Sequence, residues 1–169
     1  MSTFLKKFYF VNNKFLNLSP QDANGLVFFS DRELSLFFEK FANILGFSGR
    51  KRQFWGLFRE VFFLLRLNFR LDVRQYFKKI LSDYVVLIGI KPVRKRSIIV
   101  KELRFLQCDQ AFGLFSRWLK SAINIRAERT LAEKIYNEFV DINSGIGSTL
   151  RRRNEYVIKV LEIKKQLYI

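Results

Sequence analysis

The amino-acid sequence predicts a mainly α fold: a bundle of about six helices with one protruding basic β-hairpin. Apolar residues recur at helical spacing along most of the chain, in stretches bounded by start and stop signals for helices. One segment, at about 84–104, is instead rich in Val, Ile and Leu on both sides of a basic run, which is typical of two strands and a turn. We expect an N-terminal extension over residues 1–29 and a single domain over residues 30–169, because 169 residues with 49% hydrophobic content are enough for one core.

The helices are expected from their capping signals and apolar stripes. Ser30 and Glu33 form a capping box, and Gly46 ends the stripe that follows. Thr130 and Glu133 form a second capping box further along the chain. The expected helices occupy about 30–45, 50–67, 71–81, 109–126 and 130–142, and the last begins at about 148.

The helix expected at 109–126 has the clearest apolar stripe. Phe112, Phe115, Trp118 and Leu119 fall on one face, and Arg117 falls on the other. A large aromatic side chain on an apolar face usually belongs to the core. We therefore expect Trp118 to be buried and not to stack on nucleic-acid bases.

The β-rich segment concentrates positive charge. Its expected tip is Pro92–Arg96, and between Lys91 and Arg104 there are six cations and one acid, Glu102. Like charges crowded on a protruding element destabilise it unless a polyanion neutralises them, so we expect this hairpin to contact phosphates. The six cations are Lys91, Arg94, Lys95, Arg96, Lys101 and Arg104.

The charge of the whole chain indicates a polyanionic partner. There are 31 Lys+Arg against 15 Asp+Glu, a formal net charge of +16. Residues 1–49 hold five basic and four acidic side chains (net +1), whereas residues 50–169 hold 26 and 11 (net +15). Such an imbalance favours binding to nucleic acid, or less often to an anionic membrane, through the part of the chain beyond residue 49.

The composition argues against an enzyme. Without histidine, and with Cys108 as the only cysteine, the chain lacks the usual groups for general-base catalysis or a metal centre. The acids lie mostly at expected helix starts or singly among cations, as caps and charge neutralisers do. We expect no catalytic residue, no metal and no cofactor.

No apolar run approaches the ~18 residues of a membrane span, and residues 1–29 lack the arginines of an import peptide.

Two ordered blocks of sequence resemble one known family, small-subunit ribosomal protein seven. Lys40–Leu45 and Gly49–Lys51 resemble its "KFxNxL…GKK" start. The second block resembles its "RW(I/L)…A…R…K(S/T)M…VKKR" region without a gap, and an "NE…D" pair and a glycine also fall in place. The matching residues of this block are Arg117-Trp118-Leu119, Ala122, Arg126, Arg129-Thr130-Leu131, Asn137-Glu138, Asp141, Gly147 and Leu150–Arg153. The resemblance covers about residues 34–160.

The resemblance implies a non-catalytic protein bound to the 3′ domain of small-subunit rRNA, where the family nucleates the subunit head. It also implies head and platform proteins as neighbours, and a position near the mRNA exit and the exit-site tRNA. By matched position, the resemblance implies rRNA contacts for Arg50, Lys51, Arg117, Arg126, Arg129, Arg151, Arg152 and Arg153; the hairpin corresponds by topology.

Two further cations, Arg52 and Lys120, are also expected to contact RNA. Arg52 completes a cationic triplet at a helix start, where the macrodipole disfavours positive charge unless an external anion is bound. Lys120 lies on the polar side of the helix expected at 109–126.

The composition also bears on location. Twenty phenylalanines with two prolines, one methionine and no histidine indicate the codon bias of an AT-rich genome. The family's glycine pair in the hairpin is missing, and Asn124 and Ile125 stand where the family usually has cations. These departures favour a mitochondrial ribosome and an organelle-encoded gene.

Two other classes of function compete with this interpretation. A DNA-binding architectural or regulatory protein would use the helix at 109–126 for recognition, but its outward face lacks a cluster of Asn, Gln and Arg for base edges. A peripheral membrane protein would use the basic, Phe-rich N-terminus, but the cations there do not gather on one face.

Overall fold

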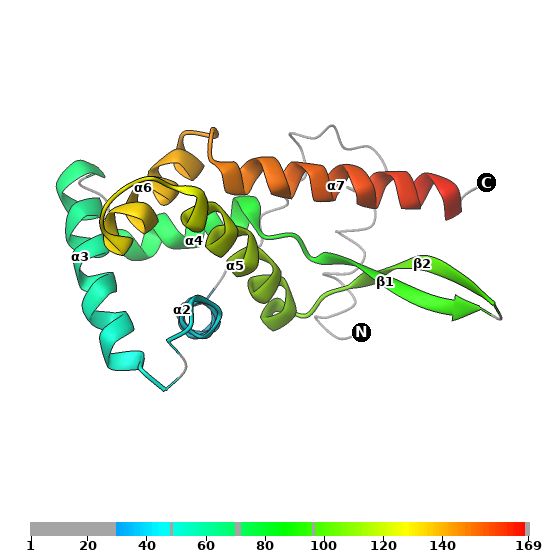
Figure 1. Ribbon diagram of the computed structural model, residues 1–169, viewed down its shortest axis with the longest axis horizontal. Helices are drawn as coiled ribbons and strands as arrows, with labels where there is room; N and C mark the ends of the chain where they lie inside the picture. Colours follow the sequence, from blue (N-terminus) through cyan, green and yellow to red (C-terminus); the bar gives the residue numbers. More distant parts are fainter. Residues whose placement is uncertain (1–29, 48, 70–71, 96, 168–169) are drawn as a thin grey trace.

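The computed structural model describes residues 30–47, 49–69, 72–95 and 97–167, and over them it shows six helices and one antiparallel hairpin (Figure 1). The mainly α prediction is therefore confirmed, while the extension expected at 1–29 lies outside the described residues. None of the described helices is long and apolar enough to cross a membrane. The elements are α2 (Asp31–Leu45), α3 (Lys51–Phe69), α4 (Val73–Tyr84), β1 (Ile88–Lys95), β2 (Ile98–Phe105), α5 (Cys108–Ile125), α6 (Leu131–Asn143) and α7 (Ser148–Leu167).

The core is built largely from phenylalanine rings that several helices contribute. The Phe41 ring of α2 has its centroid 5.8 Å from Phe58 of α3 and 6.4 Å from Phe139 of α6. One turn earlier, the Phe37 ring lies 5.9 Å from Phe112 of α5. All five side chains are fully buried, and burying each one stabilises the fold by roughly 1.5–3 kcal/mol. The apolar stripes read from the sequence therefore meet in one aromatic core.

Both expected capping boxes are present. The Ser30 hydroxyl accepts a hydrogen bond from the Glu33 amide at 3.3 Å, and the Glu33 carboxylate accepts one from the Ser30 amide at 2.8 Å. Thr130 and Glu133 make the same reciprocal pair, at 3.2 Å each. Gly46 ends α2 with φ 103°, a conformation that favours glycine. These local signals explain why the starts of α2 and α6 were predictable.

The tip of the hairpin differs from the expectation. β1 continues to Lys95, which pairs with Ile98, so only positions 96 and 97 lie between the paired strands. Pro92 pairs with Lys101 within the hairpin. A proline is tolerated there because both strands of a two-stranded hairpin have a free edge. The expected five-residue tip is therefore wrong, and Arg96 itself lies outside the described residues.

The base of the hairpin is held against α7. The hairpin and the C-terminal part of α7 extend from the bundle in the same direction (Figure 1), and α7 contacts both strands. The Tyr156 hydroxyl accepts a hydrogen bond from the Ile90 amide at 3.2 Å and donates one to the Ile88 carbonyl at 3.3 Å. Beside this contact, a Cβ at Gly89 would lie 2.6 Å from the Leu106 side chain, so any larger residue would force that side chain to shift. The arm therefore leaves the bundle from a fixed base.

Trp118 lies at this junction and not in the centre of the core. Its ring centroid is 5.3 Å from Tyr156, and the side chain is only partly buried. Its stripe neighbours Phe115 and Leu119 are fully buried, as expected. Trp118 occupies the edge of the stripe, next to exposed Arg117. Trp118 packs against the core, as expected, but it is only partly buried and lies at the edge of the core.

Candidate nucleic-acid interface

The hairpin presents cations on two faces. Successive strand residues point to opposite sides, so the register places Arg94 and Lys101 on one face and Lys91 and Arg104 on the other. All four side chains are exposed. Glu102 lies opposite Lys91, so its charge offsets part of the charge of that face. The side chain of Lys95, like Arg96, is outside the described part of the chain.

A cleft at the base of the hairpin brings two predicted cations together. It is enclosed by α2, α5, α7 and the strands, and Arg104, Arg117 and Tyr156 all line it. The third cation of the cleft, Lys40, is paired with Asp109 at 2.9 Å. Arg104 and Arg117 are exposed and have no ion-pair partner among the described residues. Their guanidinium groups are therefore available to an external anion.

The start of α3 keeps its three cations on the surface. Arg50, Lys51 and Arg52 are all exposed, and the first turn of α3 contains no acid. Lys51 pairs with Glu39 at 3.0 Å, with about half of each side chain in solvent. A pair this exposed contributes at most about 1 kcal/mol, so Lys51 can exchange it for a phosphate.

The arginine triplet in α7 does not act as one unit. Arg151 is exposed and pairs with Glu155 at 3.2 Å, and Arg152 is half-buried. Arg153 instead points back to the end of α4, where it donates to the carbonyls of Tyr84 at 3.2 Å and Asp83 at 3.3 Å. Burial there lowers the pKa of Arg153. This side chain ties α7 to α4 and is not presented to a ligand.

Arg126 is likewise engaged within the protein. It donates to Glu138 at 2.8 Å, to Glu128 at 2.9 Å and to Asp141. Burial alone would lower the pKa of Arg126, but the hydrogen bonds that it donates to these carboxylates outweigh burial and raise the pKa. With 17% of the side chain exposed, Arg126 has little capacity left for a phosphate.

The remaining two predicted cations differ from each other. Lys120 donates to the Ile44 carbonyl at 2.6 Å, which joins α5 to the last turn of α2. Arg129 is exposed between α5 and α6. The structure thus leaves Arg129 free for an external contact and gives Lys120 a packing role.

Two features of the structure are not among the predicted site residues. Lys159 and Lys165 are exposed on α7, as their helical spacing predicts, but they were not assigned to the RNA-binding surface. A groove between α2, α3 and α4, lined by aromatic side chains and arginines, was also missed. The side chains that line this groove come from three separate helices, so no local sequence motif predicts the groove.

Comparison with known proteins identifies the family. Residues 18–160 match the family model described as ribosomal protein S7p/S5e. The chain is 24% identical over 116 residues to the small ribosomal subunit protein uS7 of Thiomonas delicata, which covers 69% of this chain and 74% of that protein. It is 25% identical over 116 residues to uS7 of Sorangium cellulosum, with the same coverage. The similarity to uS7 of Thermosynechococcus vestitus is 29% over 84 residues, or 50% of this chain and 54% of that protein.

The family match spans most of the chain, including every described helix and both strands apart from the last turns of α7. The helices and hairpin agree with the fold expected from the resemblance. The chain therefore belongs to the ribosomal protein S7p/S5e family of the small ribosomal subunit, as a structural component of the translation machinery and not an enzyme.

Proposed function

We propose that this protein binds the 3′ domain of small-subunit rRNA through phosphate contacts, with the helical body as the main anchor and the hairpin as an arm that reaches beyond it. The observation that carries the proposal is the placement of four exposed cations on two faces of a hairpin whose base is fixed by Tyr156. Charge on both faces suits an arm inserted between two RNA segments better than one lying on a flat surface. Without a polyanion, these cations would only repel one another.

The proposed surface combines this arm with exposed cations of the bundle. Arg126, Lys120 and Arg153 are left out, because their donors already serve carboxylates or carbonyls. Lys95 and Arg96 remain in the proposal on sequence alone. The residues proposed to meet phosphates from the described structure are Arg50, Lys51, Arg52, Lys91, Arg94, Lys101, Arg104, Arg117, Arg129, Arg151 and Arg152.

Within the small subunit, we propose the place that the resemblance implies. The protein would help to nucleate the head, beside head and platform proteins, with the arm directed toward the mRNA exit and the exit-site tRNA. The projection of the hairpin beyond the bundle (Figure 1) supports this division between anchoring body and reaching arm. We further propose a mitochondrial ribosome with an organelle-encoded gene, on the basis of the phenylalanine-rich, histidine-free composition.

A binding assay tests the rRNA proposal. The full chain is titrated with a transcript of the 3′ domain, an unrelated structured RNA of equal length and duplex DNA, from about 50 to 200 mM salt. We expect the tightest binding to the 3′ domain and a steep fall of affinity with salt, because each neutralised phosphate releases counterions. Tighter binding to duplex DNA at matched salt would favour the DNA-binding alternative. An affinity that does not change with salt concentration would contradict the phosphate-contact mechanism.

Co-sedimentation with mitochondrial small subunits tests the proposed location.

A further inference from the structure

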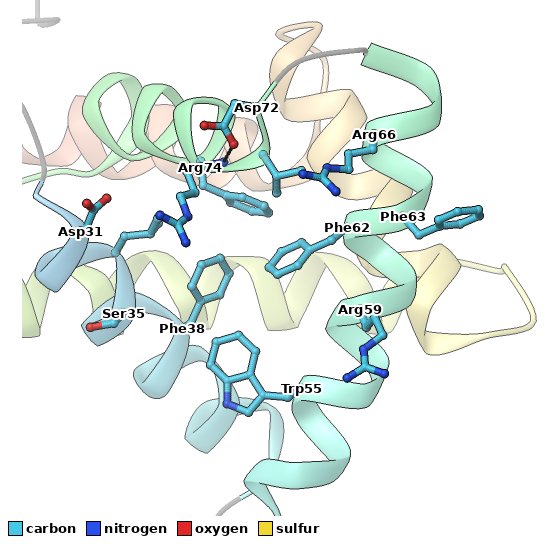
Figure 2. Close-up of a pocket in the computed structure, with 13 residues that line it drawn as sticks. Asp31, Ser35, Phe38, Trp55, Arg59, Phe62, Phe63, Arg66, Asp72 and Arg74 are labelled. Carbon is cyan, nitrogen blue, oxygen red and sulfur yellow. Dashed lines mark hydrogen bonds between the residues drawn. The ribbon is translucent and has the colours of Figure 1, made fainter.

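The groove is lined by side chains of α2, α3 and α4 (Figure 2), and these helices lie in the bundle, away from the hairpin (Figure 1). Its floor is aromatic: the Phe38 ring lies 5.8 Å from Phe62 and 5.1 Å from Phe77, centroid to centroid. Trp55 continues this row, with its ring 5.9 Å from Phe38. Figure 2 shows Phe38, Phe62 and Trp55 facing one another across the groove. The floor is therefore a continuous set of packed rings.

Two aromatic side chains of α3 remain in solvent at this groove. Trp55 is 46% exposed and Phe63 is 63% exposed, although the chain buries most of its other described aromatic rings. Phe63 points away from Phe62 in Figure 2, onto the outer side of α3. One turn further, Leu67 is also exposed. Apolar side chains gathered this way on a surface mark an interaction site more often than chance exposure.

Three arginines and two acids line the groove, so its lining carries a net positive charge. Arg59 and Arg66 of α3 and Arg74 of α4 are exposed and have no ion-pair partner among the described residues. The two acids of the lining are already engaged. Asp31 pairs with Lys78 at 2.7 Å, and Asp72 accepts a hydrogen bond from the Arg74 amide at 3.1 Å as the cap of α4.

We propose that this groove binds unpaired nucleotides of RNA, with a base stacked on Trp55 and phosphates held by Arg59, Arg66 and Arg74. Unpaired nucleotides combine the two chemistries that the groove offers, because they present free base faces beside phosphates. A duplex hides its base faces, so it would meet only the arginines. The proposal rests on the proposed function, since it assumes that the protein's partner is RNA, but it assigns a second site on a different part of the molecule.

A second attachment point has a consequence for affinity. Once the hairpin surface holds a structured RNA, a single-stranded segment of the same molecule reaches the groove at a high effective concentration. Stacking of one base on an aromatic side chain changes affinity by about five-fold to 150-fold. Loss of Trp55 should therefore weaken binding to RNA with an unpaired segment by that factor, and should leave binding to a fully paired RNA unchanged.

The two tryptophans of the chain allow a direct test. The full chain is titrated with a short single-stranded RNA and with a fully paired duplex RNA of the same length, while tryptophan fluorescence is recorded. We expect the single strand to quench the fluorescence, and Trp55→Phe to remove most of that response, because only partly buried Trp118 then remains. Arg66→Gln with Arg74→Gln should weaken binding of the single strand several-fold. The matched control is Lys79→Gln with Lys159→Gln, which removes two exposed cations that line neither the groove nor the proposed rRNA surface, and it should leave the quenching unchanged.

The outcomes separate this site from the proposed function. Binding of the 3′-domain transcript without any quenching assigned to Trp55 would overturn the groove and leave the rRNA function standing. The groove proposal would also be overturned if the duplex quenched the fluorescence as strongly as the single strand does. Quenching by an acidic, aromatic peptide, without quenching by RNA, would overturn it as well. Absence of binding to every RNA would overturn both proposals. All these variants carry surface substitutions, and circular dichroism checks that each one is folded.

Discussion

Glu138 accepts a hydrogen bond from Arg126 at 2.8 Å through one carboxylate oxygen, while its other oxygen accepts two from Thr149, at 3.0 Å and 2.6 Å. This carboxylate is 1% exposed, and it joins the end of α5 to α6 and to the start of α7. Gly147 approaches it closely, since a Cβ there would lie 3.3 Å from the Glu138 carboxylate. Arg126, Glu138 and Gly147, which the family pattern picks out, therefore form one structural unit.

The first prediction concerns this buried carboxylate. Glu138→Gln should lower the free energy of unfolding by about 3 kcal/mol, because losing one partner of a buried ion pair leaves the other uncompensated. Arg126 keeps two other carboxylates, so we expect the lower end of the range for such changes. Urea unfolding measures the loss, with Glu155→Gln as the control: it breaks an exposed pair and should cost less than about 1 kcal/mol. Equal stability of the two variants would contradict a structural role for Glu138.

The second prediction separates two arginines of the second family block. Arg126→Gln should reduce stability and leave the rRNA affinity of the folded protein nearly unchanged, because its donors serve carboxylates. Arg117→Gln should do the opposite, since Arg117 is exposed and lines the cleft at the hairpin. Thermal melting and filter binding on both variants check this. If Arg126→Gln weakened RNA binding without loss of stability, the proposed surface would have to include it.

The third prediction divides the arginine triplet of α7. Arg151→Glu with Arg152→Glu should weaken RNA binding strongly and stability little, because Arg151 is exposed and Arg152 is only half-buried near the start of α7, where the helix dipole favours acids. Arg153→Glu should destabilise the protein, since it places a carboxylate against the carbonyls of Tyr84 and Asp83. Unfolding curves recorded beside RNA titrations distinguish the two effects. A double variant that unfolds as readily as Arg153→Glu would show that the first two arginines are also structural.

The fourth prediction tests the fixed base of the arm. Tyr156→Phe removes two hydrogen bonds to β1 and keeps the ring beside Trp118. We expect a loss of about 0.5–1.5 kcal/mol per hydrogen bond, and faster hydrogen exchange at the Ile90 amide than in the parent protein. Exchange at amides in the middle of α5 is the internal control. An unchanged rate at Ile90 would mean that other contacts hold the arm.

Local chemistry explains how much of this structure the sequence predicted. The capping boxes at Ser30 and Thr130 and the apolar stripes depend on residues a few positions apart, so helix existence and order followed directly. The predicted extent of the hairpin tip was wrong for two reasons. Strand register depends on pairing between residues that are distant in sequence, and Pro92, which was expected in the turn, is tolerated within a two-stranded ribbon. Partners from other elements likewise decided that Arg126 and Arg153 face inward. Charge alone could not separate them from the cations that remain exposed.

The last prediction concerns the two faces of the arm. The connection already spans only two positions, so shortening it offers no test, and neutralising one face at a time replaces that experiment. Arg94→Gln with Lys101→Gln removes one cationic face, and Lys91→Gln with Arg104→Gln removes the other. We measure the slope of log affinity for rRNA against log salt concentration. If the arm is inserted between two RNA segments, each double variant should make this slope shallower by roughly 1.4–1.8, because each lost phosphate contact removes about 0.7–0.9. The second variant should show the smaller effect, because Glu102 already offsets part of the positive charge of that face.

None of these side chains belongs to the helical core, so both variants should enter small subunits almost normally and alter exit-site tRNA retention. An effect confined to one face would show that the arm lies on a single RNA surface, and failure to enter subunits would make the arm a primary anchor.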